Sequence, residues 1–319
     1  MNRMLSVLAS VLTLVCLFPE PLSARTDKGR DTENAGKAVI AISVDCLRLE
    51  ADYESPMETQ ELMGTVVDVL ARDGYWVKVR SPQPYEAWCT DKTLVFLDGA
   101  SLAEYNSAPK YICLARNALV YSEPSLKSRP LCDLVMGDVL RQALVKGKPV
   151  KAKKFLKVLL PDGREGFVPA KELMDMDKWK SSVNGSAEDI VALAESFLGT
   201  PYLWGGMSPK GFDCSGLVRF CYMMNGIDLP RNASQQIHLG SEAPLDRLKP
   251  GDLIFFGRRT LTGKEKVTHV GMYIGDGRFI HSSHFVRINS LSSTDADVYE
   301  GMSRLLRARR ILHQADCNK

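Results

Sequence analysis

The sequence predicts an α+β domain at the C-terminal end, preceded by two small all-β domains. Residues 187–198 and 217–224 carry apolar side chains at helical spacing. Residues 37–178 instead combine short alternating segments with turn residues and contain no convincing helix. Three segments that follow these helices, 252–256, 267–274 and 278–282, are rich in β-branched and aromatic residues, which is typical of strands. Helices followed by strands in one region, and strands alone in the other, indicate this class.

A weak internal repeat divides the all-β region into two. Segments of the first copy are Glu61-Leu62-Met63-Gly64 and Trp76-Val77-Lys78-Val79, echoed by Val135-Met136-Gly137-Asp138 and Phe155-Leu156-Lys157-Val158. Turn residues such as Pro161-Asp162-Gly163 separate the strands. Two copies of short strands predict two small β-barrels, at residues 37–105 and 106–178.

The first residues resemble a secretion signal. Met1-Asn2-Arg3 carries a positive charge, and the apolar stretch 4–18 is short for a membrane span. We expect a signal peptide at 1–24, a polar linker at 25–36, and a secreted protein in the periplasm or cell envelope. Membrane attachment is expected only if Cys16 is lipidated, which Val15 disfavours because the preceding residue would need to be smaller.

Composition and cysteine count limit the partners and the bridges. The chain has 319 residues, of which 45% are apolar, and a net charge of +3 without a basic run. Nucleic acid is therefore not an expected partner. Loss of Cys16 leaves seven cysteines, an odd number, so at least one thiol stays free. In an oxidising compartment two bridges are conceivable, Cys46 with Cys89 and Cys113 with Cys132.

Cys214 has the surroundings of a catalytic nucleophile. It stands in Gly211-Phe212-Asp213-Cys214-Ser215-Gly216, at the start of the second helical run. Free backbone N–H groups and the positive end of the helix dipole favour a thiolate there. Asp213 is a candidate cap of this helix. The alternative for this motif alone is a buried structural cysteine.

Two histidines lie on a predicted hairpin downstream. His269 is on the strand 267–274, Gly275-Asp276-Gly277 turns the chain, and His281 is on the returning strand. The pairing puts His281 opposite or diagonal to His269, within side-chain reach. A cysteine at a helix start, a histidine on a strand and a second polar residue that orients it are the parts of nucleophilic acyl transfer.

No cofactor or metal is expected. The spacing of His281-Ser282-Ser283-His284 suits a zinc site on a helix, but a strand directs the two side chains to opposite faces. His238, in a polar stretch, is expected at the surface.

Several further motifs stand in order along the C-terminal region. They are Gly199-Thr200-Pro201-Tyr202-Leu203-Trp204-Gly205-Gly206, Phe212-Asp213-Cys214-Ser215-Gly216, Leu229-Pro230-Arg231, Leu248-Lys249-Pro250-Gly251-Asp252-Leu253, and the segments of His269 and His281. With these motifs in the family's order, residues 186–313 resemble the NlpC-type branch of the papain-like cysteine peptidases, which cleave bacterial cell-wall peptides. The resemblance implies a papain-like catalytic domain at 185–319 and bacterial SH3-like domains upstream of it.

The resemblance also implies a mechanism. Cys214 is the nucleophile, His269 accepts its proton or shares an ion pair with it, and His281 orients His269. The thiolate attacks a peptide carbonyl and forms an acyl-enzyme that water hydrolyses. The oxyanion donors are the Cys214 backbone N–H and Tyr202.

The combination of domains resembles γ-D-glutamyl-L-diamino acid endopeptidases, which act on peptidoglycan peptides in recycling or remodelling. Trp204 and Ser215 match pocket residues of that group, Tyr85 its lid tyrosine and Glu58 its amine-binding glutamate; Arg231 is a further candidate. Asn232 stands where the group has an aspartate that binds a free N-terminal amine, which puts that preference in doubt.

Two other functions stay open. The same Cys-His scaffold supports an amidase or acyltransferase, and a catalytically silent module would only bind the cell wall. Intact Cys214, His269 and His281 disfavour the silent module. The choice between diaminopimelate and lysine is open.

Overall fold

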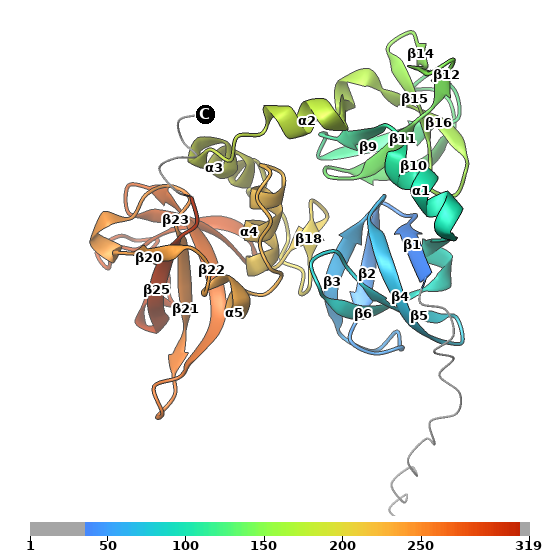
Figure 1. Ribbon diagram of the computed structural model, residues 1–319. Coiled ribbons are helices and arrows are strands. Elements are labelled where there is room, and N and C mark those ends of the chain that lie inside the picture. Colours follow the sequence, from blue (N-terminus) through green and yellow to red (C-terminus); the bar gives the residue numbers. More distant parts are fainter. Residues whose placement is uncertain (1–35, 313–319) are drawn as a thin grey trace, which may run out of the picture. The chain divides into compact units, whose positions relative to one another are not determined.

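Figure 1 shows the computed structural model of the chain, which describes residues 36–312. The predicted signal peptide, Cys16 and nearly all of the predicted linker lie outside these residues. Within the described part, the strands form three main sheets, each built from one continuous stretch of the chain. No helix in that part is long and apolar enough to cross a membrane.

The first sheet contains seven strands in the order β3-β2-β6-β5-β4-β1-β7. Alternation of buried and exposed residues along its strands directs one set of side chains, such as Val77 and Val79, into an apolar core. The strand bounds are β1 Gly36–Ile40, β2 Val44–Arg48, β3 Met57–Leu62, β4 Val66–Asp73, β5 Trp76–Arg80, β6 Glu86–Thr90 and β7 Leu94–Leu97.

A short helix, α1 (Gly99–Ser107), connects this sheet to the second one. The all-β interpretation of residues 37–178 did not include this helix. Asp98 caps it by accepting a hydrogen bond from the Ser101 backbone N–H, and only Tyr105 of the helix is buried. One buried residue gives almost no apolar periodicity, so the pattern that predicts helices is missing here.

The second sheet follows the order β10-β9-β16-β15-β11-β8-β17, and β14 pairs with β15. Its strands surround a separate core that includes Val120, Leu140 and Val158. Both upstream regions are thus strand-rich. Their SH3-like nature and the boundaries 37–105 and 106–178 remain predictions. The strand bounds are β8 Lys110–Cys113, β9 Asn117–Tyr121, β10 Pro130–Val135, β11 Val139–Gln142, β12 Leu144–Val145, β13 Lys148–Pro149, β14 Lys151–Ala152, β15 Phe155–Leu159, β16 Glu165–Pro169 and β17 Leu173–Asp175.

The C-terminal region combines helices with an antiparallel sheet of order β20-β25-β21-β22-β23-β24. As expected, Ser186 caps the helix Ala187–Ser196 (α3) and Asp213 caps the helix Cys214–Met223 (α4). The elements are α2 Met176–Ser182, α3 Ala187–Ser196, β18 Met207–Ser208, β19 Gly211–Phe212, α4 Cys214–Met223, α5 Ala233–Gln236, β20 Ser241–Ala243, β21 Leu253–Arg259, β22 Glu265–Gly275, β23 Arg278–Ser283, β24 Phe285–Ser290 and β25 Leu305–Arg310.

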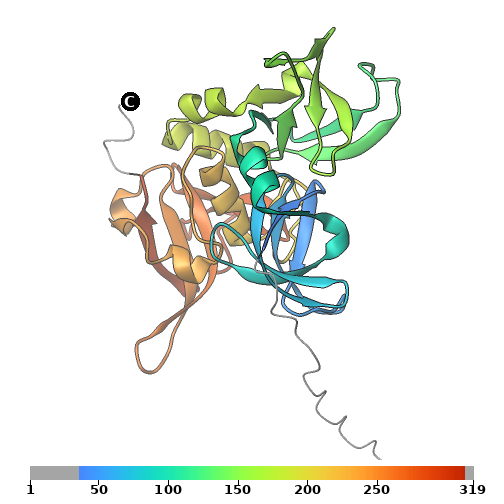
Figure 2. The same ribbon diagram turned by 45° about the vertical axis from the view of Figure 1, so that its right-hand side comes forward.

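The α4 helix packs on β22 and β23, the strands that carry the histidines (Figure 2). Phe220 and Cys221 of this helix are fully buried in the core beneath it. The same apolar cluster includes Leu62 of β3, so the first sheet packs against the catalytic region. This packing brings residues far apart in the sequence to the edge of the α4 helix.

Candidate active site

Cys214 is the first residue of α4 and is half-buried. The Asp213 carboxylate accepts a hydrogen bond from the Gly216 backbone N–H at 2.7 Å, which satisfies one of the free donors of the helix start. The α4 helix packs on β22, and the backbone groups of Ser215 and Val270 act to lower the pKa of the Cys214 thiol, against its burial. Val270 directly follows His269 on β22. The helix start and the histidine strand therefore meet near the sulfur atom.

The segment that precedes Cys214 is held to the edge of the sheet. The Tyr202 backbone N–H donates to the His284 carbonyl at 2.9 Å, and the Val286 N–H donates to the Thr200 carbonyl at 2.8 Å. The Leu203 N–H donates to the Phe212 carbonyl at 3.1 Å, two residues before Cys214. These bonds place Tyr202 between the outer strand β24 and the nucleophile.

Glycine is required where this segment crosses α4. A Cβ atom at Gly216 would overlap the carbonyl oxygen of Gly206. The missing side chain lets the loop backbone lie directly on the first turn of the helix. The close contact of Gly206 with Gly216 thus sets the distance between the loop and the first turn of the nucleophile helix.

His269 and His281 form the predicted pair. The Met272–Ile280 pairing, continued along the strands, puts His281 opposite Gly271 and diagonal to His269. A Cβ atom at Gly271 would overlap the Phe279 ring. The His269 Nε2 atom lies 2.7 Å from His281 Nδ1.

A residue that the sequence analysis did not identify, Asn289 of β24, continues this chain. Its side-chain Nδ2 donates to the Asp297 carbonyl at 2.7 Å, so its Oδ1 faces His281 Nε2 at 2.9 Å. His281 must therefore donate from Nε2 and accept at Nδ1 from His269 Nε2–H. That tautomer leaves His269 Nδ1 as the free acceptor. An asparagine on an outer strand has no local sequence signal, because only the pairing of β23 with β24 brings it to His281.

Burial keeps the reacting groups neutral. Burial raises the pKa of the Cys214 thiol to about 11, and the Asp213 carboxylate acts in the same direction. Burial lowers the pKa of His269 to about 3 and that of His281 to about 4. Burial thus acts against the thiolate that the helix start favours, since desolvation disfavours the charged form. Of the two roles left open for His269, the neutral groups favour proton acceptance over a resting ion pair.

Tyr299 is a second residue that the sequence analysis missed. Its ring stacks on His269 with a centroid distance of 5.7 Å and meets His281 edge-on at 5.0 Å. Phe256 and Phe279 enclose the same group. Aromatic walls of this kind shield the fully buried His281 and one face of His269, and they fix the two ring planes. The irregular segment that carries Tyr299 has no strand or helix pattern in the sequence.

A cavity of about 380 Å³ opens beside His269. The predicted oxyanion residue Tyr202 lines it, and burial raises the pKa of its hydroxyl to about 12, so this group is a hydrogen-bond donor at neutral pH. Trp204, predicted for the pocket, is 64% exposed. The cavity is lined by Tyr202, Thr268, His269, Ser282, Ser283, His284, Tyr299 and Arg304.

Three predicted binding residues come together from distant parts of the chain. The Tyr85 hydroxyl donates to the Glu58 carboxylate, and the Asn232 side chain lies near enough to lower the pKa of this hydroxyl. Glu58 is on β3, Tyr85 precedes β6, and Asn232 precedes α5. The first sheet therefore supplies two polar side chains to the edge of the catalytic region.

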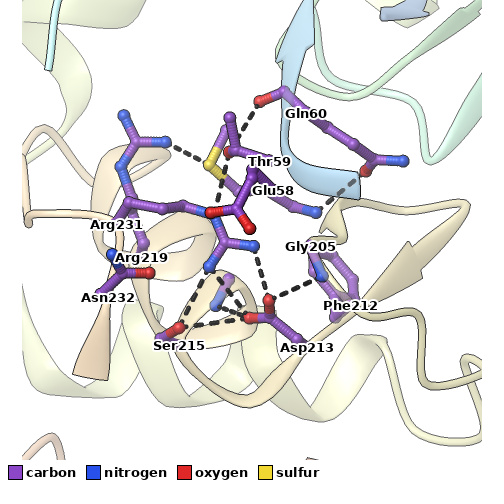
Figure 3. Close-up of polar contacts among 12 residues, drawn as sticks. Glu58, Thr59, Gln60, Gly205, Phe212, Asp213, Ser215, Arg219, Arg231 and Asn232 are labelled. Atoms are coloured by element: carbon purple, nitrogen blue, oxygen red, sulfur yellow. Dashed lines mark hydrogen bonds and ion pairs between the residues drawn. The ribbon is translucent and has the colours of Figure 1, made fainter. Parts of the chain in front are cut away.

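Arg231 and Ser215, also predicted for substrate contact, are buried in a network with Asp213 (Figure 3). The Arg231 guanidinium donates to both Asp213 oxygens, at 3.0 and 2.5 Å, and to Ser215 Oγ at 3.0 Å. Its Nε donates to Thr59 Oγ1 of β3 at 2.9 Å. Four donor contacts of Arg231 are thus made within the protein. The network connects the first sheet to the cap of the nucleophile helix.

The described cysteines are not joined by disulfides, and His281 and His284 do not face a common site. All six cysteines of the described region are free thiols, so the two conceivable bridges are not formed. Cys46 is exposed and Cys89 is buried, which places the two thiols in different environments. His284 lines the cavity whereas His281 is fully buried, so the pair does not converge. Between residues 36 and 312, no three His, Cys, Asp or Glu side chains are grouped to hold a metal ion.

Comparison with known proteins agrees with this arrangement. The model of the NlpC/P60 family matches residues 199–301. A gamma-D-glutamyl-L-lysine dipeptidyl-peptidase of Bacillus cereus is 32% identical over 71% of this chain and 67% of the relative. The Bacillus subtilis protein of that name is 30% identical over 79% of this chain and 81% of the relative. A crystal structure of an NlpC/P60 family protein from Bacillus cereus is similar with a TM-score of 0.73 and 27% identity, covering 87% of this chain and 100% of that one.

Proposed function

The chain belongs to the NlpC/P60 family and is a cysteine peptidase, and from that premise we propose that it hydrolyses the γ-D-glutamyl-L-diamino acid bond of peptidoglycan-derived peptides. The observation that carries this proposal is the packing of α4, the helix that begins at Cys214, on β22, where His269 Nε2 lies 2.7 Å from His281 Nδ1. The names of the two Bacillus relatives, which cover most of both chains, support the choice of bond. We also propose, from the signal-peptide pattern alone, that the protein acts in the cell envelope.

The proposed reaction begins with proton transfer. His269 Nδ1 takes the Cys214 proton while the sulfur attacks the γ-carbonyl carbon of D-glutamate. The C–N bond then breaks, and the proton passes from His269 to the amine of the leaving diamino acid. Water, deprotonated by His269, next hydrolyses the thioester and releases the dipeptide. His281 and Asn289 keep His269 in the required tautomer throughout.

Two donors are proposed for the oxyanion of each tetrahedral intermediate. The Cys214 backbone N–H lies at the start of α4, and the Tyr202 hydroxyl lines the cavity beside His269. The backbones that carry both donors are held before the substrate arrives, because the bonds of the 199–206 segment fix the Tyr202 backbone and the Asp213 cap fixes the first helical turn. Donors that need no rearrangement stabilise the developing charge most effectively.

The proposed site for the substrate's N-terminal amine is the group of Glu58, Tyr85 and Asn232. Glu58 supplies the negative charge and Asn232 supplies only a neutral amide. Arg231 acts in this proposal as a positioning residue, since its donors are directed to Asp213, Ser215 and Thr59. Truncating Tyr85 should weaken discrimination between short and long peptides without changing thiol alkylation.

The test uses L-Ala-γ-D-Glu-meso-diaminopimelate and its N-acetylated form, with products identified by mass spectrometry. We expect release of L-Ala-D-Glu from the free-amine peptide by the wild type, none by Cys214→Ala, and normal release by the matched control Cys46→Ala. Asn232→Asp should increase the preference for the free amine roughly tenfold, because it adds a charge-assisted hydrogen bond. Transfer of an acyl group without hydrolysis, or no reaction at all, would contradict the proposal.

A further inference from the structure

The cavity beside His269 and the amine-binding group lie on different elements. The cavity is lined only by residues of the C-terminal region, whereas Glu58 and Tyr85 come from the first sheet. If the N-terminal dipeptide occupies the first-sheet side, as proposed above, the leaving diamino acid lies on the other side of the scissile bond. The cavity next to the base His269 is the space available for it.

Arg304 gives this cavity its charge. It is the only lysine, arginine, aspartate or glutamate among the lining residues, and the other side chains are neutral aromatic, hydroxyl or imidazole groups. Arg304 is exposed, and its guanidinium makes no hydrogen bond or ion pair with any residue from 36 to 312; only its backbone N–H donates, to the Gly301 carbonyl. The nearby Glu300 is instead paired with Arg287 at 3.0 Å. The guanidinium charge is therefore free to meet an anion.

The fold places Arg304 at the wall of the cavity. Residues Met302–Arg304 form a 3-10 turn that follows Gly301. A Cβ atom at Gly301 would overlap the Tyr299 ring and approach the Arg304 Nη2 atom to 2.8 Å. The arginine thus packs across this glycine beside Tyr299, which in turn stacks on His269. Its charge reaches the reaction centre, since it contributes to lowering the pKa of His269.

We propose that this cavity binds the leaving diamino acid and that Arg304 selects a side chain that carries a carboxylate, so that meso-diaminopimelate is preferred over lysine. This inference depends on the function proposed above. The lysine side chain ends in an ammonium group alone, which Arg304 repels and which no acidic residue of the cavity compensates. The diaminopimelate side chain adds a carboxylate at the same carbon, and arginine binds carboxylates through two parallel N–H groups.

The experiment compares kcat/KM for three tripeptides L-Ala-γ-D-Glu-X, where X is meso-diaminopimelate, its side-chain amide, or L-lysine. All three carry the same α-carboxylate, so ratios between them isolate the side-chain carboxylate. The ratios also cancel any effect of Arg304 on His269. The variants are Arg304→Ala, Arg304→Lys and Arg304→Glu, with Arg247→Ala as the matched control because it removes an equally charged, exposed side chain outside the cavity.

We expect the wild type and Arg247→Ala to prefer diaminopimelate over both other peptides, roughly fivefold to tenfold, as suits one partly solvated charge pair. Arg304→Ala should bring the ratios close to one through a higher KM for diaminopimelate, Arg304→Lys should keep part of the preference, and Arg304→Glu should favour lysine. Cleavage of all peptides with ratios that Arg304→Ala leaves unchanged would overturn this inference alone. Cleavage of none by the wild type would overturn the proposed function and this inference with it.

Discussion

Replacement of Asn289 by leucine tests the hydrogen-bond chain that orients the catalytic base. Leucine has the same branching at Cγ but accepts no hydrogen bond, so His281 loses the acceptor that lies 2.9 Å from its Nε2 atom. His281 is then free to place its proton on Nδ1, and His269 Nε2–H no longer has an acceptor 2.7 Å away. The reaction needs the His269 tautomer whose Nδ1 atom carries no proton, and in the variant this tautomer is no longer favoured over the other one.

The size of the effect follows from one hydrogen bond. A buried hydrogen bond contributes about 1–1.5 kcal/mol, and about 1.4 kcal/mol corresponds to a tenfold change in an equilibrium. We therefore expect kcat/KM to fall about tenfold in Asn289→Leu. The buried His281 N–H and the Asp297 carbonyl both lose a partner, so the free energy of unfolding should fall by about 1–3 kcal/mol.

Asn289→Asp separates orientation from charge. The carboxylate still accepts from His281 Nε2–H, but its negative charge favours protonated imidazoles. In the wild type, the lowered pKa values of His269 and His281 place the acidic limb of kcat/KM below pH 6.5. We expect Asn289→Asp to move this limb to higher pH while activity at pH 8 stays closer to wild type than in Asn289→Leu.

The assay measures kcat/KM for the free-amine tripeptide between pH 4 and 9, together with urea unfolding. Asn117→Leu, an exposed asparagine on β9, is the matched control and should behave as wild type. Wild-type kcat/KM in a folded Asn289→Leu protein would refute the argument that Asn289 sets the tautomer. An acidic limb that does not move in Asn289→Asp would refute the charge coupling.

Three further predictions concern stability. Arg231→Leu leaves the buried Asp213 carboxylate without its ion-pair partner. The free energy of unfolding, measured by urea titration, should fall by about 3–5 kcal/mol. A fall of less than about 1 kcal/mol would contradict a stabilising role for this ion pair. Gly216→Ala should reduce both the melting temperature and Cys214 activity, because its Cβ overlaps a loop carbonyl; normal values for both would show that the loop can move away. Because the pKa values of His269 and His281 are lower in the folded protein, the unfolded chain binds more protons below pH 6.5. The free energy of unfolding should therefore be unaffected by these histidines above pH 6.5, and below it should fall by up to about 1.4 kcal/mol per histidine for each pH unit. Equal urea midpoints at pH 7 and pH 5 would contradict this direction.

Local patterns were sufficient for several elements of the catalytic region. Apolar periodicity and capping residues predicted α3 and α4 with their caps Ser186 and Asp213, and the structure confirms both. The glycine-rich turn between two β-branched segments predicted the hairpin that brings His269 and His281 together. The α1 helix was missed because a helix with one buried residue has no periodic face.

The sequence by itself determined the class of the catalytic region, the cysteine at a helix start and the histidine pair, because helix capping and strand pairing depend on neighbouring residues. Only the tertiary structure decided the rest. Asn289 and Tyr299 reach the histidines through strand pairing and ring packing. Arg231 donates its hydrogen bonds to Asp213 and Thr59 within the protein. Desolvation, which no local pattern reports, also acts against the expected thiolate of Cys214, because burial depends on which distant segments cover a group.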